Sequence, residues 1–386
     1  MSRIRGSVLV FMFIVGLITP TLAQDYNPLP VAMPSLQIAP DARGGGMGDI
    51  GASSMPDVYS QHWNAAKYPF IGSEGGFAFS YTPWLSKLVG GIHMLYASGY
   101  RKFGTGDANA ISASLRYFTL GSVDVPDPSG KFWQSVGPHE LALDVAYSRN
   151  LSETFSGAVT MRYIRADYST GDDETTPGNA FAVDIAGYNE SYFHLGRSEA
   201  LLGLGFNFSN IGTKISYDGG TTSMFLPANM RIGASLGYPF DTKNTLSLSL
   251  DLNKLLVPTP PLPIEGEAGE ETEQRMRDYY NISSIGGAFQ SFGDAPGGFK
   301  EELQEIMWSA GVEYTYDNQF SLRTGYHHEN EYKGNRRYMA FGAGFRSRGF
   351  QVDAAYLVSV TQSNPMDQTL RVSLGFDIDG LRTLFF

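Results

Sequence analysis

Hydrophobic and polar residues alternate one by one in many short windows of this chain. In TLSLSLDL, leucines occupy positions 246, 248, 250 and 252, and serine or aspartate occupies the positions between them. A period of two residues places successive side chains on opposite faces of a β-strand. The alternation recurs in about fourteen windows of roughly ten residues, the length of a membrane-crossing strand. The windows begin near Gly75, Gly90, Ala108, His139, Thr154, Ala180, Glu199, Ala228, Asn244, Trp308, Phe320, Arg337, Phe350 and Gln368.

The links between these windows alternate in length. NLSE, HLGRSE, FDTKN, YDNQ and RSRG are short, whereas GSVDVPDPSGKFWQSVGP and the segment 257–307 are long. Outer-membrane barrels have an even number of strands, short periplasmic turns and longer extracellular loops. The sequence therefore predicts an all-β fold, in which residues 75–386 form a transmembrane antiparallel β-barrel of about fourteen strands and 257–307 is a long extracellular loop.

Charged side chains fall on the parity opposite to that of the apolar residues. A charge facing lipid costs about 2–4 kcal/mol at the bilayer midplane. This parity is therefore expected to face the lumen, where charges of both signs indicate ion pairing rather than a transport pathway. The predicted lumenal charges are Arg116, Asp144, Arg162, Asp184, Arg231, Asp251, Glu313, Arg323, Arg346, Asp353 and Arg371.

The N-terminal residues predict export and then a segment unlike the barrel. Arg3 and Arg5 precede an apolar run and the small-residue end TLA, a pattern typical of a secretory signal peptide over residues 1–23. Residues 24–74 are rich in Pro, Gly and small side chains and lack alternation. We expect this segment to enter the barrel as a hatch or plug; the alternative is a disordered periplasmic tail.

Composition and motifs restrict the chemistry. The chain has no cysteine and a net charge of −11, which disfavours lipidation, disulfides and nucleic-acid binding. Gly46, Gly48 and Gly51 match a dinucleotide fingerprint, but no strand leads into it and no helix follows it. The G-x-S-x-G match at 233–237 lies within a strand pattern rather than at a turn. No spacing predicts a catalytic residue, a metal site or a cofactor.

Several motifs resemble one family of outer-membrane proteins. In ARGGGMGDIGASSMPDVYSQHWNAAKY, the order A-R, M-G-x-x-G-A and W-N-x-A resembles the hatch of FadL-type barrels, and most closely the PorV family of the type IX secretion system. LPANMRIGASLGY and LSLDLNKLLVP are also similar to that family. Ala65 departs from the usual proline, so substrate gating by the hatch is not expected. The hatch residues implied by the resemblance are Arg43, Gly46, Met47, Gly48, Gly51, Trp63 and Asn64.

The resemblance implies an outer-membrane secretion component rather than an enzyme. PorV-like barrels engage the outer-membrane translocon (SprA/Sov-like) and bind the C-terminal signal domain of cargo. They pass the cargo to an attachment complex that contains a PorU-type sortase. The lipid bilayer and lipopolysaccharide are further expected partners. The alternative function is FadL-type uptake of a hydrophobic small molecule, which requires an apolar pocket where this sequence predicts lumenal charge.

The segment 257–307 is the predicted partner-binding loop. It begins with VPTPPLP, continues into acidic EGEAGEETEQ, and then carries aromatic residues among glycines. Aromatic side chains dominate many interfaces and rim charges steer association; the alternative is a merely solvated loop. The residues expected to contact a partner are Glu265, Glu267, Glu270, Glu271, Glu273, Tyr279, Tyr280, Phe289, Phe292 and Phe299. Whether the final LRTLFF forms a strand or a tail stays open.

Overall fold

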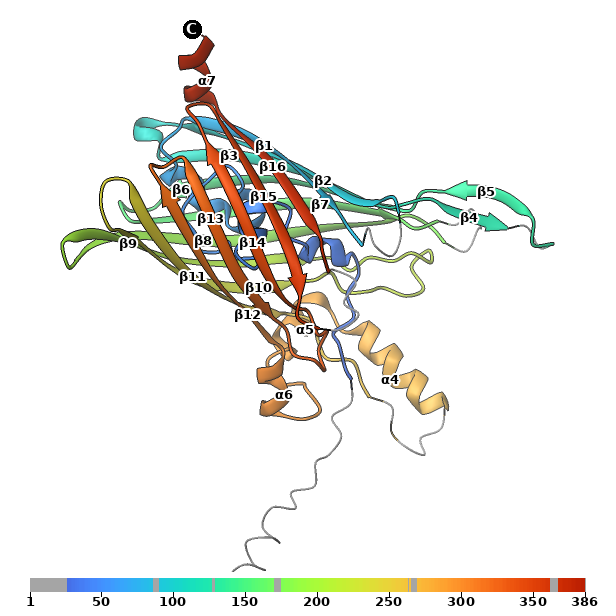
Figure 1. Ribbon diagram of the computed structural model, residues 1–386. Coiled ribbons are helices and arrows are strands. Elements are labelled where there is room, and N and C mark those ends of the chain that lie inside the picture. Colours follow the sequence, from blue (N-terminus) through green and yellow to red (C-terminus); the bar gives the residue numbers. More distant parts are fainter. Residues whose placement is uncertain are drawn as a thin grey trace, which may run out of the picture.

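The computed structural model describes residues 26–85, 90–126, 129–169, 175–262, 264, 269–361 and 367–385. Its main element is a closed antiparallel β-barrel of fourteen strands (Figure 1). The barrel strands are β1 (Gly75–Pro83), β2 (Ile92–Phe103), β3 (Asn109–Leu120), β6 (His139–Asn150), β7 (Phe155–Asp167), β8 (Gly178–Leu195), β9 (Ser198–Gly212), β10 (Asn229–Pro239), β11 (Asn244–Leu255), β12 (Ile306–Tyr316), β13 (Phe320–His328), β14 (Arg337–Arg346), β15 (Phe350–Ser359) and β16 (Leu370–Asp377). The predicted signal peptide, Glu265 and Glu267 lie outside the described residues.

The barrel confirms the strand prediction. Each barrel strand begins within two residues of its expected start. β1 closes the barrel by pairing with β16, and Gly76 lies opposite Asp377. Closure pairs the backbone groups of both terminal strands, which a strand in hydrocarbon requires because no water is present to bond them.

The two faces of the wall differ as the alternation predicts. In β11, Leu248, Leu250 and Leu252 are 46 %, 48 % and 46 % exposed, whereas Ser247 and Asp251 are buried. The exposed apolar side chains cover the outer face, which suits contact with lipid. Among the described residues, no helix is both long and apolar enough to cross a membrane.

Short and long connections lie at opposite ends of the barrel. The end with the short turns, such as those at 151–154 and 317–319, is called here the turn end, and the other is called the loop end. Helix α7 (Ile378–Phe385) follows β16 at the turn end, so the C-terminal segment is a helix rather than a strand. Figure 1 shows α7 pointing away from the barrel at that end.

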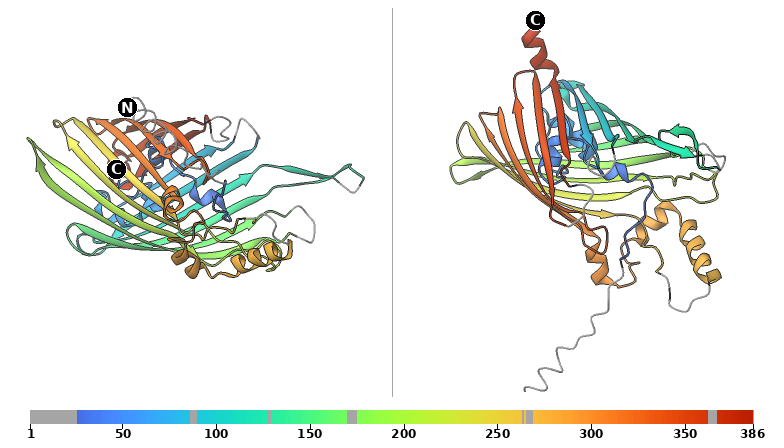
Figure 2. Two further views of the ribbon diagram at one scale, coloured as in Figure 1. Left: turned by 90° about the horizontal axis from the view of Figure 1, so that it is seen from below. Right: turned by 45° about the vertical axis from the view of Figure 1, so that its right-hand side comes forward.

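The loop end contains structure that the sequence did not predict. A two-stranded hairpin, β4 (Val123–Pro126) and β5 (Phe132–Val136), extends beyond the wall (Figure 2). The segment 257–307 forms α4 (Gly269–Asn281), α5 (Ser284–Gln290) and α6 (Phe299–Gln304) instead of an irregular loop. Helix α4 begins with two acidic residues, which stabilise the positive end of a helix dipole. A single 3-10 turn, η3 (Thr105–Asp107), connects β2 to β3 at the turn end.

The N-terminal residues lie inside the barrel (Figure 1, blue). They form four short helices, η1 (Pro34–Gln37), α2 (Ala42–Gly46), α3 (Ser60–Trp63) and η2 (Ala65–Phe70). The segment enters at the loop end, where the Asn27 N–H donates to the Tyr332 carbonyl. It leaves at the turn end, where Ser73 precedes β1. Its apolar residues pack on the inner wall, with Tyr68 stacked on Tyr100 of β2.

Candidate functional site

Trp63 organises the middle of the N-terminal segment. Its indole N–H donates to Asp41 Oδ2 at 2.6 Å, and the same carboxylate caps α2 by accepting the Gly44 N–H at 2.7 Å. A Cβ at Gly51 would lie 2.2 Å from Trp63 Cγ, so only glycine fits against the ring. The Arg231 guanidinium lies 4.8 Å from the ring centroid, a distance suited to a cation–π contact. The predicted hatch residues Gly51 and Trp63 are therefore direct neighbours.

The remaining predicted hatch residues contact the wall. Met47 and Gly48 lie against Gly325 of β13, where an added Cβ would be 2.0 Å from the Met47 carbonyl carbon. Gly48 has φ +80°, which favours glycine, and Gly46 approaches the backbone of Gly342. The Asn64 amide donates to the Ala52 carbonyl at 2.8 Å and to the Gly187 carbonyl of β8 at 3.0 Å. Backbone thus meets backbone directly, without an intervening side-chain layer.

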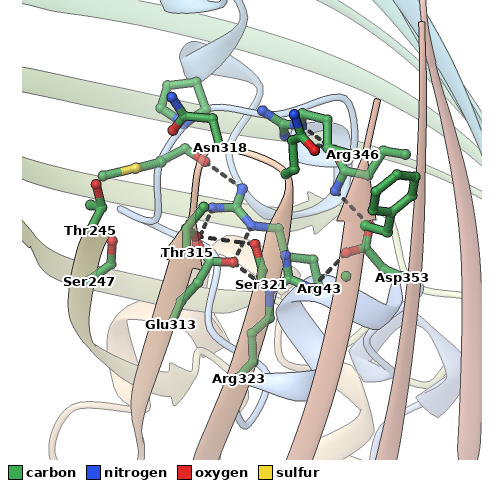
Figure 3. A pocket seen from close by; sticks show the side chains of 16 residues that line it. Arg43, Thr245, Ser247, Glu313, Thr315, Asn318, Ser321, Arg323, Arg346 and Asp353 are labelled. Carbon is green, nitrogen blue, oxygen red and sulfur yellow. Dashed lines mark hydrogen bonds and ion pairs between the residues drawn. The ribbon is translucent and has the colours of Figure 1, made fainter. Parts of the chain in front are cut away.

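Arg43 joins this segment to the wall through buried carboxylates. Its Nη1 donates to Asp57 Oδ2 at 2.5 Å, and its Nε and Nη2 donate to Glu313 of β12 at 3.1 and 2.9 Å. Arg323 of β13 also donates to Glu313 and reaches Asp353 of β15 at 2.6 Å. Figure 3 shows the side chains of Arg43, Glu313, Arg323 and Asp353 pointing toward one another. We call Arg43, Asp57, Glu313, Arg323 and Asp353 the arginine cluster.

The other predicted lumenal charges also converge on the interior. Arg162 donates to Asp144 at 2.7 Å and to Asp184 at 2.9 Å, whereas the remaining charges bond mainly to the N-terminal segment. Arg116 donates to the Ile38 carbonyl and contacts His62. Asp251 accepts hydrogen bonds from the N–H groups of Gly51 and Ala52. Arg231 donates to the Asp49 carbonyl, and Arg371 pairs with the Asp49 carboxylate. Ser235 of the G-x-S-x-G match lies within β10 and donates to the Ser53 carbonyl. Arg346 alone among the predicted charges is exposed, at the rim of the turn end.

Burial changes the acid–base chemistry of the N-terminal segment. Burial raises the pKa of Asp41 to about 6, and nearby Asp57 adds to the increase. Burial lowers the pKa of Lys67 to about 8, although its ammonium donates to the Gly51 carbonyl at 2.9 Å. The sequence pattern did not single out Asp41, Asp57 and Lys67, although they are among the few charged residues in a segment of small side chains. The small number of charged residues in this segment was the signal that could have identified them.

A polar pocket of about 280 Å³ opens at the turn end. Arg43, Glu313, Arg323 and Asp353 of the arginine cluster line it, together with hydroxyl side chains of β11, β12 and β13 (Figure 3). Its rim includes Arg346 and Gln351. A larger pocket of about 490 Å³ is lined by outward-facing residues such as Leu248 and Leu250, so it lies on the outer face of the wall.

The predicted partner-binding residues divide into two groups. Phe289, Phe292 and Phe299 are 77 %, 52 % and 78 % exposed, and the described acidic residues of α4 are also exposed. Tyr279 is only 4 % exposed, because its ring packs on Phe225 and its hydroxyl donates to the Pro258 carbonyl. The expectation that Tyr279 faces a partner is therefore wrong: it fixes α4 to the barrel mouth. Tyr280 is half-buried beside it.

A second buried charge cluster holds α6 to the barrel. Lys254 of β11 donates to Glu302 at 3.1 Å and to Glu305 at 2.6 Å. Lys333 pairs with Glu301 at 2.5 Å and with Glu305 at 3.0 Å. We call these residues the lysine cluster; sequence analysis did not identify it. Across the described residues, no group of three or more His, Cys, Asp or Glu side chains is arranged to hold a metal ion.

A closed barrel with an apolar outer face and a polar, filled interior defines an integral β-barrel of the outer membrane. Residues 21–262 match the family model described as "Type IX secretion system protein PorV". The chain belongs to this family, which confirms the resemblance in its sequence, and it is an outer-membrane component of the type IX secretion system. No curated protein matches the sequence.

Two solved structures are similar to this chain over most of its length. The Pseudomonas putida toluene transporter TodX is 10 % identical, with 92 % of this chain and 99 % of that chain covered, at a TM-score of 0.48. A Pseudomonas aeruginosa FadL homologue is 12 % identical, with 91 % and 99 % covered, at a TM-score of 0.42. Similarity at this level says nothing about what this chain transports.

Proposed function

We propose that this protein engages the secretion translocon, receives cargo through its C-terminal signal domain and passes it to an attachment complex that contains a PorU-type sortase. The observation that carries the proposal is an exposed apolar patch on the helices at the loop end. Short turns and long loops assign the turn end to the periplasm and the loop end to the cell exterior. The patch therefore faces the side on which surface attachment takes place.

The patch combines α5, α6 and the segment between them. We call it the loop patch, and its exposed residues are Ile285, Phe289, Phe292, Phe299 and Leu303. Exposed apolar side chains are available to a partner, and aromatic side chains contribute most strongly to binding. The lysine cluster fixes α6 to the barrel mouth, and the buried Tyr279 fixes the preceding helix α4. Helices that are already held in place lose less conformational entropy when a partner binds.

We further propose that residues 24–74 are a permanent plug of the barrel formed by 75–386. The arginine cluster and the direct backbone contacts at Gly325 and Gly342 support this division. Removing one partner from a buried ion pair costs about 3–5 kcal/mol, so the segment does not leave the lumen readily. Cargo is then handled outside the lumen, at the loop patch.

Uptake of a hydrophobic molecule through the lumen has weaker support. The pocket at the turn end is lined by arginines and carboxylates, whereas the apolar pocket lies on the outer face of the wall. A hydrophobic ligand requires mostly apolar walls.

The test is capture of translocon and cargo from detergent-solubilised outer membrane. Phe289→Ser together with Phe299→Ser should reduce co-purification by about tenfold or more, because hot-spot aromatics each contribute above about 1 kcal/mol. The matched control is Phe132→Ser, which changes an exposed aromatic on the β4–β5 hairpin at the same end. All variants should still shift on unheated gels as folded barrels. Equal capture by the double variant and the control would contradict the proposal.

A further inference from the structure

We propose that the polar pocket at the turn end binds the carboxylate of a peptide chain that enters it from the periplasm. This site is separate from the loop patch, and the proposal does not depend on cargo capture there. Three arginines and two carboxylates line the pocket, namely Arg43, Arg323, Arg346, Glu313 and Asp353. Of the three arginines, only Arg346 lacks a carboxylate partner among the described residues.

The charge of Arg346 is the one in this lining that no carboxylate of the described residues offsets. Arg43 and Arg323 each pair with two carboxylates. Arg346 has no ion pair among the residues that the structure describes; its Nε and Nη2 donate to Gln351 Oε1 at 3.0 and 2.7 Å. A neutral amide orients this guanidinium without cancelling its charge. The Nη1 group has no partner in the described part of the chain, so it is available to an incoming acceptor.

Gln351 is itself held in one orientation. It is buried, and its Nε2 donates to Asp353 Oδ2 at 2.6 Å. Asp353 is fixed in turn by Arg323 and by the Tyr59 hydroxyl, at 2.6 and 3.0 Å. The amide oxygen of Gln351 must therefore point toward Arg346. A chain of hydrogen bonds from the plug to the rim thus prepares the guanidinium for a second, charge-assisted contact.

The pocket suits the end of a chain. Its volume of about 280 Å³ lies just below the roughly 300–1,000 Å³ of small-molecule sites. Beyond the arginine, its lining offers hydroxyl and amide groups that match a peptide backbone, together with a few apolar side chains. These residues are Thr245, Ser247, Thr315, Ser321, Asn318, Gln319, Met55, Pro56 and Phe345. A bare inorganic anion would leave this mixed lining unused.

The pocket lies between the turn end and the N-terminal segment. Asn318 and Gln319 belong to the turn between β12 and β13, at the turn end. Arg43 and Pro56 of the N-terminal segment close the opposite side. We therefore expect a ligand to enter at the turn end and to stop at the N-terminal segment.

The experiment measures binding of a dansylated Gly-Ser pentapeptide to the full-length protein in detergent. The peptide with a free C-terminal carboxylate should bind about tenfold tighter than its C-terminal amide, because hydrogen bonds to charged groups contribute about 1.5–3 kcal/mol. Arg346→Gln should remove this difference. The matched control is Arg197→Gln, an exposed arginine on the turn between β8 and β9, which should keep it. Folding of each variant is checked by its shift on unheated gels.

Two results would overturn the proposal. One is equal affinity of Arg346→Gln and the unchanged protein for the free-acid peptide. The other is binding of acetate or inorganic phosphate as tightly as the peptide, which would make the site a general anion site. Loss of the peptide preference in the control as well would assign it to overall surface charge and would equally refute the assignment to Arg346.

Discussion

Two buried charge clusters in this protein contain the same number of cations and carboxylates but differ in the type of cation. The arginine cluster in the lumen and the lysine cluster beneath α6 each contain two cations and three carboxylates, all buried. In the lumen the cations are Arg43 and Arg323; at the loop end they are Lys254 and Lys333. The difference between guanidinium and ammonium determines what each cluster holds in place.

Arginine fixes the orientation of the carboxylates that it binds, whereas lysine only holds them close. A guanidinium is planar and presents donors in a rigid fork, and an ammonium is a compact charge on a flexible stem. Arg43 and Arg323 connect carboxylates from the N-terminal segment, β12 and β15. Lys254 and Lys333 both contact carboxylates in or next to α6 alone. The lumenal segment is therefore held in one orientation against several strands, whereas the lysine cluster holds α6 at the barrel mouth.

The largest effect is expected in the arginine cluster. Arg43→Ala leaves Glu313 and Asp57 buried without one of their partners, which should destabilise the protein by about 3–5 kcal/mol. Urea unfolding, followed by loss of the gel shift, measures this change. Arg101→Ala is the control, since its ion pair with Glu74 is about half exposed. A loss below about 1 kcal/mol for Arg43→Ala would show that the cluster does not hold the segment.

The next comparison introduces an arginine on the outer face of β11, where no buried carboxylate can pair with it. Leu248→Arg places a cation on the outer face and should cost about 2–4 kcal/mol if the residue lies near the bilayer midplane. Ser247→Arg changes the adjacent residue, which lines the polar pocket with Glu313 and should be tolerated. Yield of folded barrel in the outer membrane distinguishes the two. Similar yields would mean that the faces of β11 have been assigned wrongly.

The lysine cluster should give a smaller and local effect. Lys254→Met removes one partner from Glu302 and Glu305, but Glu305 keeps Lys333. The cost is about 1–3 kcal/mol and should be confined to α6. Hydrogen exchange should accelerate in 299–304 while the urea midpoint of the barrel stays unchanged. Lys243→Met, at an exposed turn, is the control; global unfolding of Lys254→Met would remove the distinction between the clusters.

The sequence predicts the wall well because its signal is local. The two-residue period of a strand such as β11 depends on that strand alone and not on the elements that face it across the barrel. Helix α4 was missed although 270–281 contains neither Gly nor Pro and begins with Glu270 and Glu271, a recognisable helix start. The β4–β5 hairpin is too short for its alternation to stand out.

The partners of each charge were beyond sequence reasoning. The position of Glu313 in the alternating pattern predicted that its side chain faces the lumen. Its partner Arg43, however, lies 270 positions away in the sequence. Such pairing depends on closure of the barrel and on the path of the N-terminal segment. Likewise, Tyr279 and Phe289 are both aromatic residues of one loop, and only the packing of Phe225 separates a buried from an exposed role.

The smallest stability effect is expected on the exposed face of α4, which has charges but no cluster. Glu273 and Arg277 form an ion pair with both side chains more than half exposed, and such pairs contribute about 0.3–0.5 kcal/mol. Replacing Glu270, Glu271 and Glu273 by Gln should therefore leave the urea midpoint unchanged. The same change should slow association with a basic partner domain and weaken its dependence on salt, because rim charges act mainly on encounter. Stopped-flow binding at two salt concentrations measures this, with Glu153→Gln at the turn end as control. A change in dissociation rate instead of association rate would mean that α4 lies within the bound interface, and that its acids hold the partner directly as the buried clusters hold their own elements.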